Sequence, residues 1–304
     1  MTLETAYATC RRIAQHYENF PVGLLVRRPL RPHIHAIYAF ARLADDIADE
    51  GYDSSSDEAL PERTAAGRRK GLLRFETALR DPASAPEDAV FVALHQTIQE
   101  FDLPIDLFLD LLSAFAQDVE KRRYASFAEL LDYCRRSANP IGRLVLLIHG
   151  QKREEQLAAS DAICTALQIT NFWQDLSVDL LKDRIYLPQD EMKRFGVTEE
   201  SLFAGLASCE FRGLLAMEVE RAFQLFEQGY GLMATLPRPL CWEIELTWQS
   251  GRRILEKIVD LDFDTLHHRP TLDALDAPTL LAKAFFRIRD GLPRLSESVA
   301  LGSS

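Results

Sequence analysis

Residues 33–50 read HIHAIYAFARLADDIADE, an apolar pattern that ends in four acidic side chains. The apolar residues recur at steps of three and four, as on one face of an α-helix; they are Ile34, Ile37, Tyr38, Ala41, Ala44, Ile47 and Ala48. Pro32 suits the first turn of this helix and Gly51 suits its C-terminal cap. The acidic residues lie where the helix dipole is already negative, and like charges at this spacing repel. Helix stability therefore does not explain them.

The same periodicity dominates the rest of the chain. It predicts further helices within residues 103–124, 126–150, 161–183, 211–236, 241–263 and 277–292. Strand patterns are nearly absent from the sequence, and no linker is long or polar enough to divide it. We therefore predict an all-α fold, a single domain over residues 1–304 with roughly eight to twelve helices. A basic run at residues 67–74, GRRKGLLR, is interpreted as a solvated helix face.

Composition excludes several classes of protein. The formal net charge of −11 argues against general nucleic-acid binding, which needs clustered Lys and Arg. The five cysteines include no C-x-x-C pair, which favours a reducing cytoplasm over a disulfide scaffold or a zinc site. The sequence lacks both a signal-peptide pattern and an apolar run of membrane-spanning length. We expect a cytoplasmic enzyme; peripheral contact with the inner face of a membrane is left open.

A second acidic pattern lies in TNFWQDLSVDLLKDRIYLP, where Asn171, Asp175, Asp179 and Asp183 step by four. They predict one polar stripe on a helix whose other faces are apolar, and such a stripe is costly to bury without cations. Hard oxygen ligands favour Mg²⁺, which also coordinates phosphates. Two such stripes could hold Mg²⁺ ions and a diphosphate between them. The alternative is a solvated acidic face, which is common for a single D-x-x-x-D.

These two stretches resemble the head-to-head prenyl synthases, namely the squalene, dehydrosqualene and phytoene synthases. The resemblance runs from about His16 to Arg269. It implies an isoprenoid-synthase-type helical bundle with a central cavity between two aspartate-rich helices. The first family motif, Arg followed by D-x-x-x-D, is matched by Arg42, Asp45 and Asp49. The second, N-x-x-x-D-x-x-x-D, is matched by Asn171, Asp175 and Asp179.

The resemblance also implies roles for individual residues. The Mg²⁺ ligands would be Asp45, Asp46, Asp49, Asn171, Asp175 and Asp179. The substrate contacts would be Tyr17, Arg42, Gln174, Lys182, Arg184, Tyr186 and Arg269. The catalytic positions, which would orient water or diphosphate or face a carbocation, are Asn19, Phe20 and Tyr133. For Arg42, Lys182 and Arg184, ion pairing with neighbouring aspartates is the alternative role.

Two departures from the family pattern narrow the expected activity. Tyr17 and Asn19 stand where many members have serines, and Gln174 replaces an arginine. Both changes weaken the case for holding two farnesyl diphosphates at once. The combination resembles one bacterial branch, the hydroxysqualene synthases of hopanoid-type squalene biosynthesis. That branch ionises presqualene diphosphate and adds water, a lyase reaction.

Two alternatives stay open. One is a synthase that condenses two prenyl diphosphates to presqualene diphosphate, squalene or phytoene. The other is a catalytically inactive relative of the same fold that acts as an assembly factor. The expected partner is a prenyl diphosphate, and contacts with enzymes of the same pathway are left open.

Overall fold

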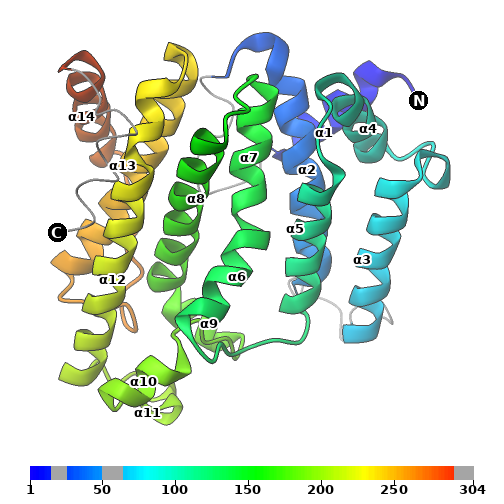
Figure 1. Cartoon of the computed structure of the whole chain (residues 1–304). Coiled ribbons are helices and arrows are strands. Elements are labelled where there is room, and N and C mark those ends of the chain that lie inside the picture. The colour runs from blue at the N-terminus through cyan, green and yellow to red at the C-terminus, as the bar shows by residue number, and fades with distance from the viewer. Residues whose placement is uncertain (15–25, 50–63, 291–304) are drawn as a thin grey trace. The chain divides into compact units, whose positions relative to one another are not determined.

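The computed structural model of the chain describes residues 1–14, 26–49 and 64–290 (Figure 1). Within these ranges the regular elements are helices, and the extended pairing consists of one isolated bridge between Arg123 and Ile185. The predicted all-α class is confirmed. None of the described helices is long and apolar enough to cross a membrane.

The chain forms two compact units. The first comprises Met1–Lys121 and Pro140–Lys152, and the second comprises Arg122–Asn139 and Arg153–Ser304. The single domain expected from the sequence stays a prediction.

The first unit is built around α2 (Arg31–Ala48), whose first turn holds Pro32 as predicted. The other elements are α1 (Leu3–Ala14), η1 (Arg28–Leu30), α3 (Ala65–Arg80), η3 (Pro82–Ser84), α4 (Ala89–Phe101), α5 (Ile105–Asp118) and α7 (Asn139–Ile148). α2 packs against α1, α3, α4 and α5. The fully buried Phe40 of α2 meets Phe91 and Phe108 edge-on, with ring centroids 6.0 and 5.6 Å apart. This aromatic contact fixes the side of α2 that faces the core.

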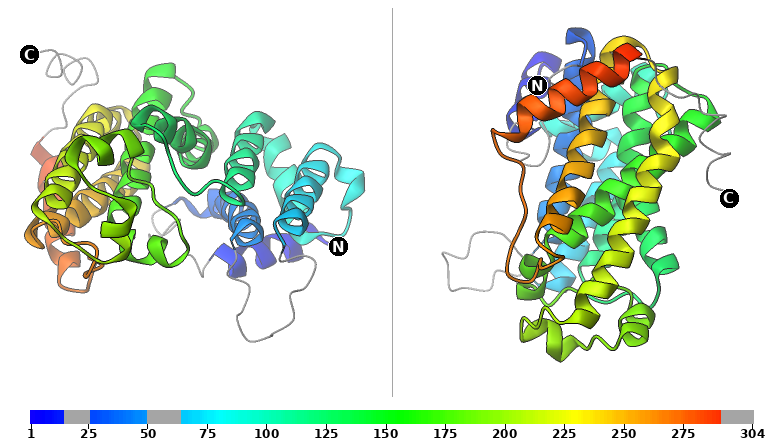
Figure 2. Two further views of the ribbon diagram at one scale, coloured as in Figure 1. Left: turned by 90° about the horizontal axis from the view of Figure 1, so that it is seen from below. Right: turned by 90° about the vertical axis from the view of Figure 1, so that its left-hand side faces the viewer.

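The second unit is built around α8 (Glu154–Gln174). The other elements are α6 (Phe127–Ser137), α9 (Leu176–Leu181), α10 (Gln189–Phe195), α11 (Glu199–Phe203), α12 (Cys209–Gly229), η4 (Tyr230–Thr235), α13 (Arg238–Asp260) and α14 (Asp276–Asp290). α8, α12 and α13 lie side by side, and α14 lies against α13 (Figures 1 and 2). α8 and α12 approach closely at Gly229, where a Cβ would lie 2.6 Å from the Ala159 carbonyl oxygen. Glycine is therefore required there by space.

Two predicted helices are each divided in the structure. The one expected over 126–150 is α6 and α7, separated at Ala138, because Pro140 cannot donate to the preceding turn but suits a helix start. The one expected over 161–183 is α8 and α9, separated at Asp175, whose ψ of 12° departs from helical values. With the short α10 and α11, these breaks bring the described ranges to fourteen α-helices. The predicted eight to twelve is therefore too low.

α2 ends earlier than the sequence predicts from a C-terminal cap at Gly51. Its last residue is Ala48, and Asp49 caps it with an extended ψ of 146°. The predicted cap, Gly51, lies outside the described residues.

Candidate active site

The first aspartate motif occupies the last turn of α2. The backbone N–H of Asp49 donates to the Asp45 carbonyl oxygen at 2.8 Å, so these two residues stay one helical turn apart. Asp45, Asp46 and Asp49 are all partly exposed. The motif therefore presents carboxylate oxygens at a helix end, as the spacing predicts.

Two arginines offset the negative charge at this end of α2. Arg42 Nε lies 3.1 Å from Asp46 Oδ1. Arg42 thus takes the ion-pair role, and its phosphate contact stays a prediction. Arg68 of α3 donates from Nη1 to the Ala48 carbonyl oxygen at 2.7 Å. Arg68 is 7 % exposed, so the expectation of a fully solvated basic run is wrong at this position. A cation at a helix C-terminus favours the dipole and satisfies a terminal carbonyl.

The second motif crosses the junction of α8 and α9. The Asp175 N–H donates to the Asn171 carbonyl oxygen at 2.9 Å, and the Asp179 N–H donates to the Asp175 carbonyl oxygen at 2.8 Å. The four-residue hydrogen-bond spacing therefore survives the break in the helix. Asn171, Asp175 and Asp179 are partly exposed and follow one another by single turns, as predicted.

Asp183 does not belong to this stripe. Its φ of +55° turns the chain out of the helical path, and its carboxylate accepts from Arg123 Nη2 at 2.7 Å. This hydrogen bond lowers the pKa of Asp183 below its ordinary value. The sequence-based inclusion of Asp183 is wrong because helical spacing stops at Leu181. The sequence analysis missed Arg123. Its Nη2 also lies 2.8 Å from Glu199 Oε2, so Arg123 links Asp183 to α11.

The basic residues after the second motif lie in the turn that Arg123 stabilises. The Lys182 carbonyl oxygen accepts from Arg122 Nη1 at 2.8 Å, and the Arg184 N–H donates to the Asp179 carbonyl oxygen at 2.9 Å. Lys182 is exposed and Arg184 is half-buried. Their contact with phosphate stays a prediction.

A clasp joins the α8–α9 junction to a segment about ninety residues later. Arg269 donates to Asp175 through Nε at 2.6 Å and Nη2 at 3.3 Å. Next to it, Gln174 Nε2 donates to the Pro270 carbonyl oxygen at 2.6 Å, and Gln174 is buried. The neighbouring residues Gln174 and Asp175 thus contact the neighbouring residues Pro270 and Arg269. The structure brings the predicted residues Gln174, Asp175 and Arg269 together.

Four buried aromatic rings form a cluster beside the second motif: Tyr124, Tyr133, Phe172 and Tyr186. Tyr186 stacks on Phe172 with centroids 3.8 Å apart and planes 10° apart. Tyr133 lies 6.0 Å from Phe172 and 6.3 Å from Tyr186. The sequence analysis missed Tyr124, whose ring stacks on Tyr186 at 5.5 Å. Its signal was a lone aromatic residue within the polar run EKRRYAS between two helices.

Three predicted site residues, Tyr17, Asn19 and Phe20, lie outside the described residues. Their roles stay predictions.

The donor atoms of both motifs fit a hard divalent cation. Within residues 1–14, 26–49 and 64–290, no three Asp, Glu, His or Cys side chains gather around one point. Mg²⁺ does not need such a group, because it binds through one or two carboxylates and completes its shell with water and substrate phosphates. Asp175 already attracts a cationic group, the Arg269 guanidinium, through both oxygens. The residues present therefore fit Mg²⁺.

Residues 13–276 match the family model for squalene/phytoene synthases, which covers both aspartate motifs and the clasp. The chain belongs to the squalene/phytoene synthase family. Enzymes of this family process prenyl diphosphates.

Individual members of the squalene/phytoene synthase family differ in their similarity to the chain. The hydroxysqualene synthase of Zymomonas mobilis is 35 % identical over 221 residues, which cover 72 % of this chain and 71 % of that protein. The chloroplastic phytoene synthase of Narcissus pseudonarcissus is 30 % identical over 276 residues, which cover 88 % of this chain and 63 % of that protein.

The crystal structure of squalene synthase HpnC from Alicyclobacillus acidocaldarius superimposes with a TM-score of 0.76 at 38 % sequence identity. The superimposed residues cover 86 % of this chain and 96 % of the HpnC chain. The predicted isoprenoid-synthase-type fold is confirmed.

Proposed function

We propose that the protein is a hydroxysqualene synthase. It would ionise presqualene diphosphate with the help of Mg²⁺ and let water capture the cation, which releases hydroxysqualene and diphosphate. This lyase reaction would serve bacterial squalene and hopanoid biosynthesis.

One observation favours hydroxysqualene synthase over the other activities of the family. Identity reaches 35 % with a hydroxysqualene synthase and 38 % with squalene synthase HpnC, against 30 % with a phytoene synthase. The replacement of a family arginine by Gln174 supports the same choice. The buried Gln174 amide donates to a backbone carbonyl and carries no charge for a second diphosphate.

Six residues would hold Mg²⁺: Asp45, Asp46, Asp49, Asn171, Asp175 and Asp179. When bound, Mg²⁺ neutralises the negative charge that develops on a departing diphosphate. Arg42 and Arg269 now pair with Asp46 and Asp175. If Mg²⁺ were held by those carboxylates, both guanidinium groups would be placed to donate to phosphate oxygens in their two-pronged geometry.

The aromatic cluster would line the site of the carbocation. Aromatic faces attract cations. Phe172 and Tyr186 are stacked on each other, which closes those two faces. Tyr133 lies at their side with a tilted ring and is the better candidate to face the cation or to orient water.

A second candidate function is the condensation of two prenyl diphosphates. The match to phytoene synthase extends over 88 % of the chain, further than the 72 % matched by the hydroxysqualene synthase. The same motifs would then bind two substrates in turn.

Product analysis tests the proposal. The purified chain with Mg²⁺ is incubated with presqualene diphosphate, farnesyl diphosphate or geranylgeranyl diphosphate, and the extracts are analysed by mass spectrometry. We expect hydroxysqualene from presqualene diphosphate, with its oxygen labelled in H₂¹⁸O. Product from farnesyl or geranylgeranyl diphosphate alone would favour the condensing enzyme. No product from any of the three would favour the inactive relative.

A further inference from the structure

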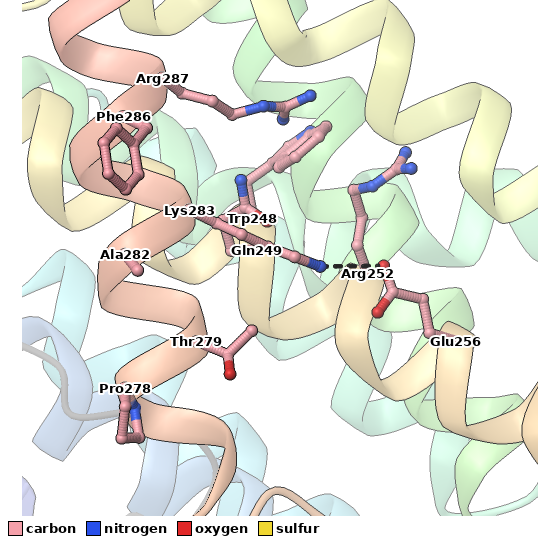
Figure 3. Close-up of a pocket in the computed structure, with 10 residues that line it drawn as sticks. All are labelled: Trp248, Gln249, Arg252, Glu256, Pro278, Thr279, Ala282, Lys283, Phe286 and Arg287. Atoms are coloured by element: carbon pink, nitrogen blue, oxygen red, sulfur yellow. Dashed lines mark ion pairs between the residues drawn. The ribbon is translucent and has the colours of Figure 1, made fainter.

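A groove of about 660 Å³ runs between α13 and α14 in the second unit (Figure 3). α13 contributes Trp248, Arg252 and Glu256, and α14 contributes Lys283, Phe286 and Arg287. None of these residues belongs to the aspartate motifs, the clasp or the aromatic cluster. The chemistry proposed above does not use this groove.

The charge of the groove is opposite to that of the whole chain. Its walls carry three cationic side chains and one carboxylate, in a chain of formal net charge −11. The carboxylate of Glu256 neutralises little of this charge. Its Oε1 lies 3.5 Å from Lys283 Nζ with both side chains more than one-third exposed, and such pairs are weak in water.

Two guanidinium groups lie against one fixed indole ring. The Cζ atoms of Arg252 and Arg287 lie 4.6 and 4.8 Å from the ring centroid of Trp248 (Figure 3). Trp248 is fully buried, and its Nε1 donates to the Phe226 carbonyl oxygen at 2.9 Å, so the ring cannot turn freely. Cation–π contacts hold both arginines in place although their charges repel. Burial lowers the pKa of Arg252, and the charge of Arg287 adds to this effect.

The two arginines differ in their counter-ions. Arg252 Nη1 lies 2.5 Å from Glu227 Oε1. Arg287 has no ion-pair partner among the described residues and instead lies over Tyr230 and Trp248. The charge of Arg287 also acts on Glu245, which is fully buried. Burial raises the pKa of that carboxyl, and the charge of Arg287 opposes this effect. Arg287 therefore lies against two aromatic rings, with no carboxylate of the described residues at ion-pair distance.

We propose that this groove is a second anion site that binds a phosphate group carrying an apolar substituent. Arg287 and Lys283 would hold the phosphate, since a guanidinium fork and an ammonium both donate to phosphate oxygens. Phe286 is 50 % exposed on the same wall and would cover the apolar substituent. A soluble phosphate ester and the headgroup of an anionic lipid both offer this chemistry.

Calorimetric titration of the full chain in EDTA tests the site, because removing divalent metal silences a metal-dependent site. The probes are inorganic phosphate, hexyl phosphate, and vesicles of phosphatidylcholine with or without phosphatidylglycerol. Arg287→Gln and Lys283→Gln are compared with Arg289→Gln, a matched charge change on the same helix that does not line the groove. Thermal unfolding confirms that each variant is folded.

Hexyl phosphate should bind more tightly than inorganic phosphate. Arg287→Gln should weaken it at least tenfold, Lys283→Gln several-fold, and Arg289→Gln less than twofold. Binding only to phosphatidylglycerol vesicles, with the same order of variants, identifies a lipid headgroup as the source. Equal losses in Arg287→Gln and Arg289→Gln, or no binding by any probe, would overturn the proposal. So would loss of binding in Asp175→Asn, which would place the anion at the second motif.

Discussion

Arg269 and Asp175, 94 residues apart in the sequence, form a two-pronged ion pair with N–O distances of 2.6 and 3.3 Å. The guanidinium occupies both oxygens of a carboxylate that the family motif assigns to metal. If Mg²⁺ were held by Asp175, as proposed above, it would compete with Arg269 for the same carboxylate oxygens, and the guanidinium would then be placed to donate to a phosphate. Under that proposal the pair would couple metal binding to the position of a phosphate ligand.

If Asp175 is a metal ligand as proposed, Arg269→Gln removes a cation that would compete with the metal for it. An ion pair at this degree of exposure contributes up to about 1 kcal/mol, so Mn²⁺, used as a spectroscopic substitute, should bind roughly two- to fivefold more tightly. Electron paramagnetic resonance titration measures free Mn²⁺ directly. Arg212→Gln is the matched control, since Arg212 also pairs with an aspartate, Asp262, that belongs to neither motif. Weaker Mn²⁺ binding in Arg269→Gln would show that the guanidinium supports the metal site instead.

Asp45→Asn and Asp175→Asn should each lower kcat by about 10²–10³-fold, because each removes a charge that acts on the transition state. Both side chains are partly exposed, so the melting temperature should change by only a few degrees. Steady-state kinetics and thermal unfolding measure the two effects. Asp106→Asn, on an exposed position in the first turn of α5, should leave kcat unchanged and cost no more than about 1 kcal/mol of stability, the contribution of its charge to the helix dipole. Unchanged turnover in either motif variant would contradict its assignment as a metal ligand.

Two substitutions of Tyr186 distinguish a role in packing from a role in substrate binding. Tyr186→Ala removes a ring that stacks on Phe172 and Tyr124 and should lower the free energy of unfolding by about 3–5 kcal/mol. Tyr186→Phe keeps the ring, so stability should fall by no more than about 1–2 kcal/mol. Urea denaturation measures both changes. A fall in kcat/KM in the stable Phe variant would assign the hydroxyl to substrate binding, whereas unchanged kinetics would limit Tyr186 to packing.

Glu218 should make the second unit less stable as pH rises. This carboxyl is fully buried on α12; burial and a hydrogen bond with Glu191 raise its pKa to about 9. Between pH 4.5 and 9 the unfolded chain releases this proton while the folded chain keeps it, so unfolding becomes easier with rising pH. Glu218→Gln should flatten the fall in unfolding free energy between pH 5 and 8. Denaturant titrations across this range test it, with the exposed Glu220→Gln as control. An unchanged slope in Glu218→Gln would contradict the raised pKa.

Asp276 should stabilise the attachment of α14 to α13. Burial opposes its ionisation, but hydrogen bonds from Lys257, the Asp273 backbone and Arg253 prevail and lower its pKa to about 2. The Asp276 carboxylate lies 2.6 Å from Lys257 Nζ and 2.9 Å from Arg253 Nε. Its stabilisation is complete above about pH 5 and is lost as pH falls toward 2.

Asp276→Asn tests this contribution at neutral pH. It should cost roughly 2–3 kcal/mol, because two cations lose their buried partner. Hydrogen exchange should localise the loss to α14 and the adjoining part of α13. A variant as stable as the parent at pH 7, with unchanged protection of α14, would show that the pair contributes nothing net.

The helices were predictable because their signal is local. An apolar stripe and a proline in the first turn are properties of neighbouring residues, and α2 begins where they place it. The four-residue spacing of both aspartate motifs was also read correctly from the sequence, because one turn of hydrogen bonds joins each pair. Local rules failed where a single backbone torsion ended the helix, at Asp49 and again at Asp175.

The partners of the motif residues depend on the tertiary structure. No local pattern joins Arg123 to Asp183 over 60 residues or Arg269 to Asp175 over 94. By itself, the sequence determined the helical class, the family and the carboxylate register, since periodicity and motif spacing are short-range. Only the tertiary structure decided which cation neutralises each carboxylate, because an ion pair needs its two charges within about 4 Å and chain folding alone brings distant residues that close.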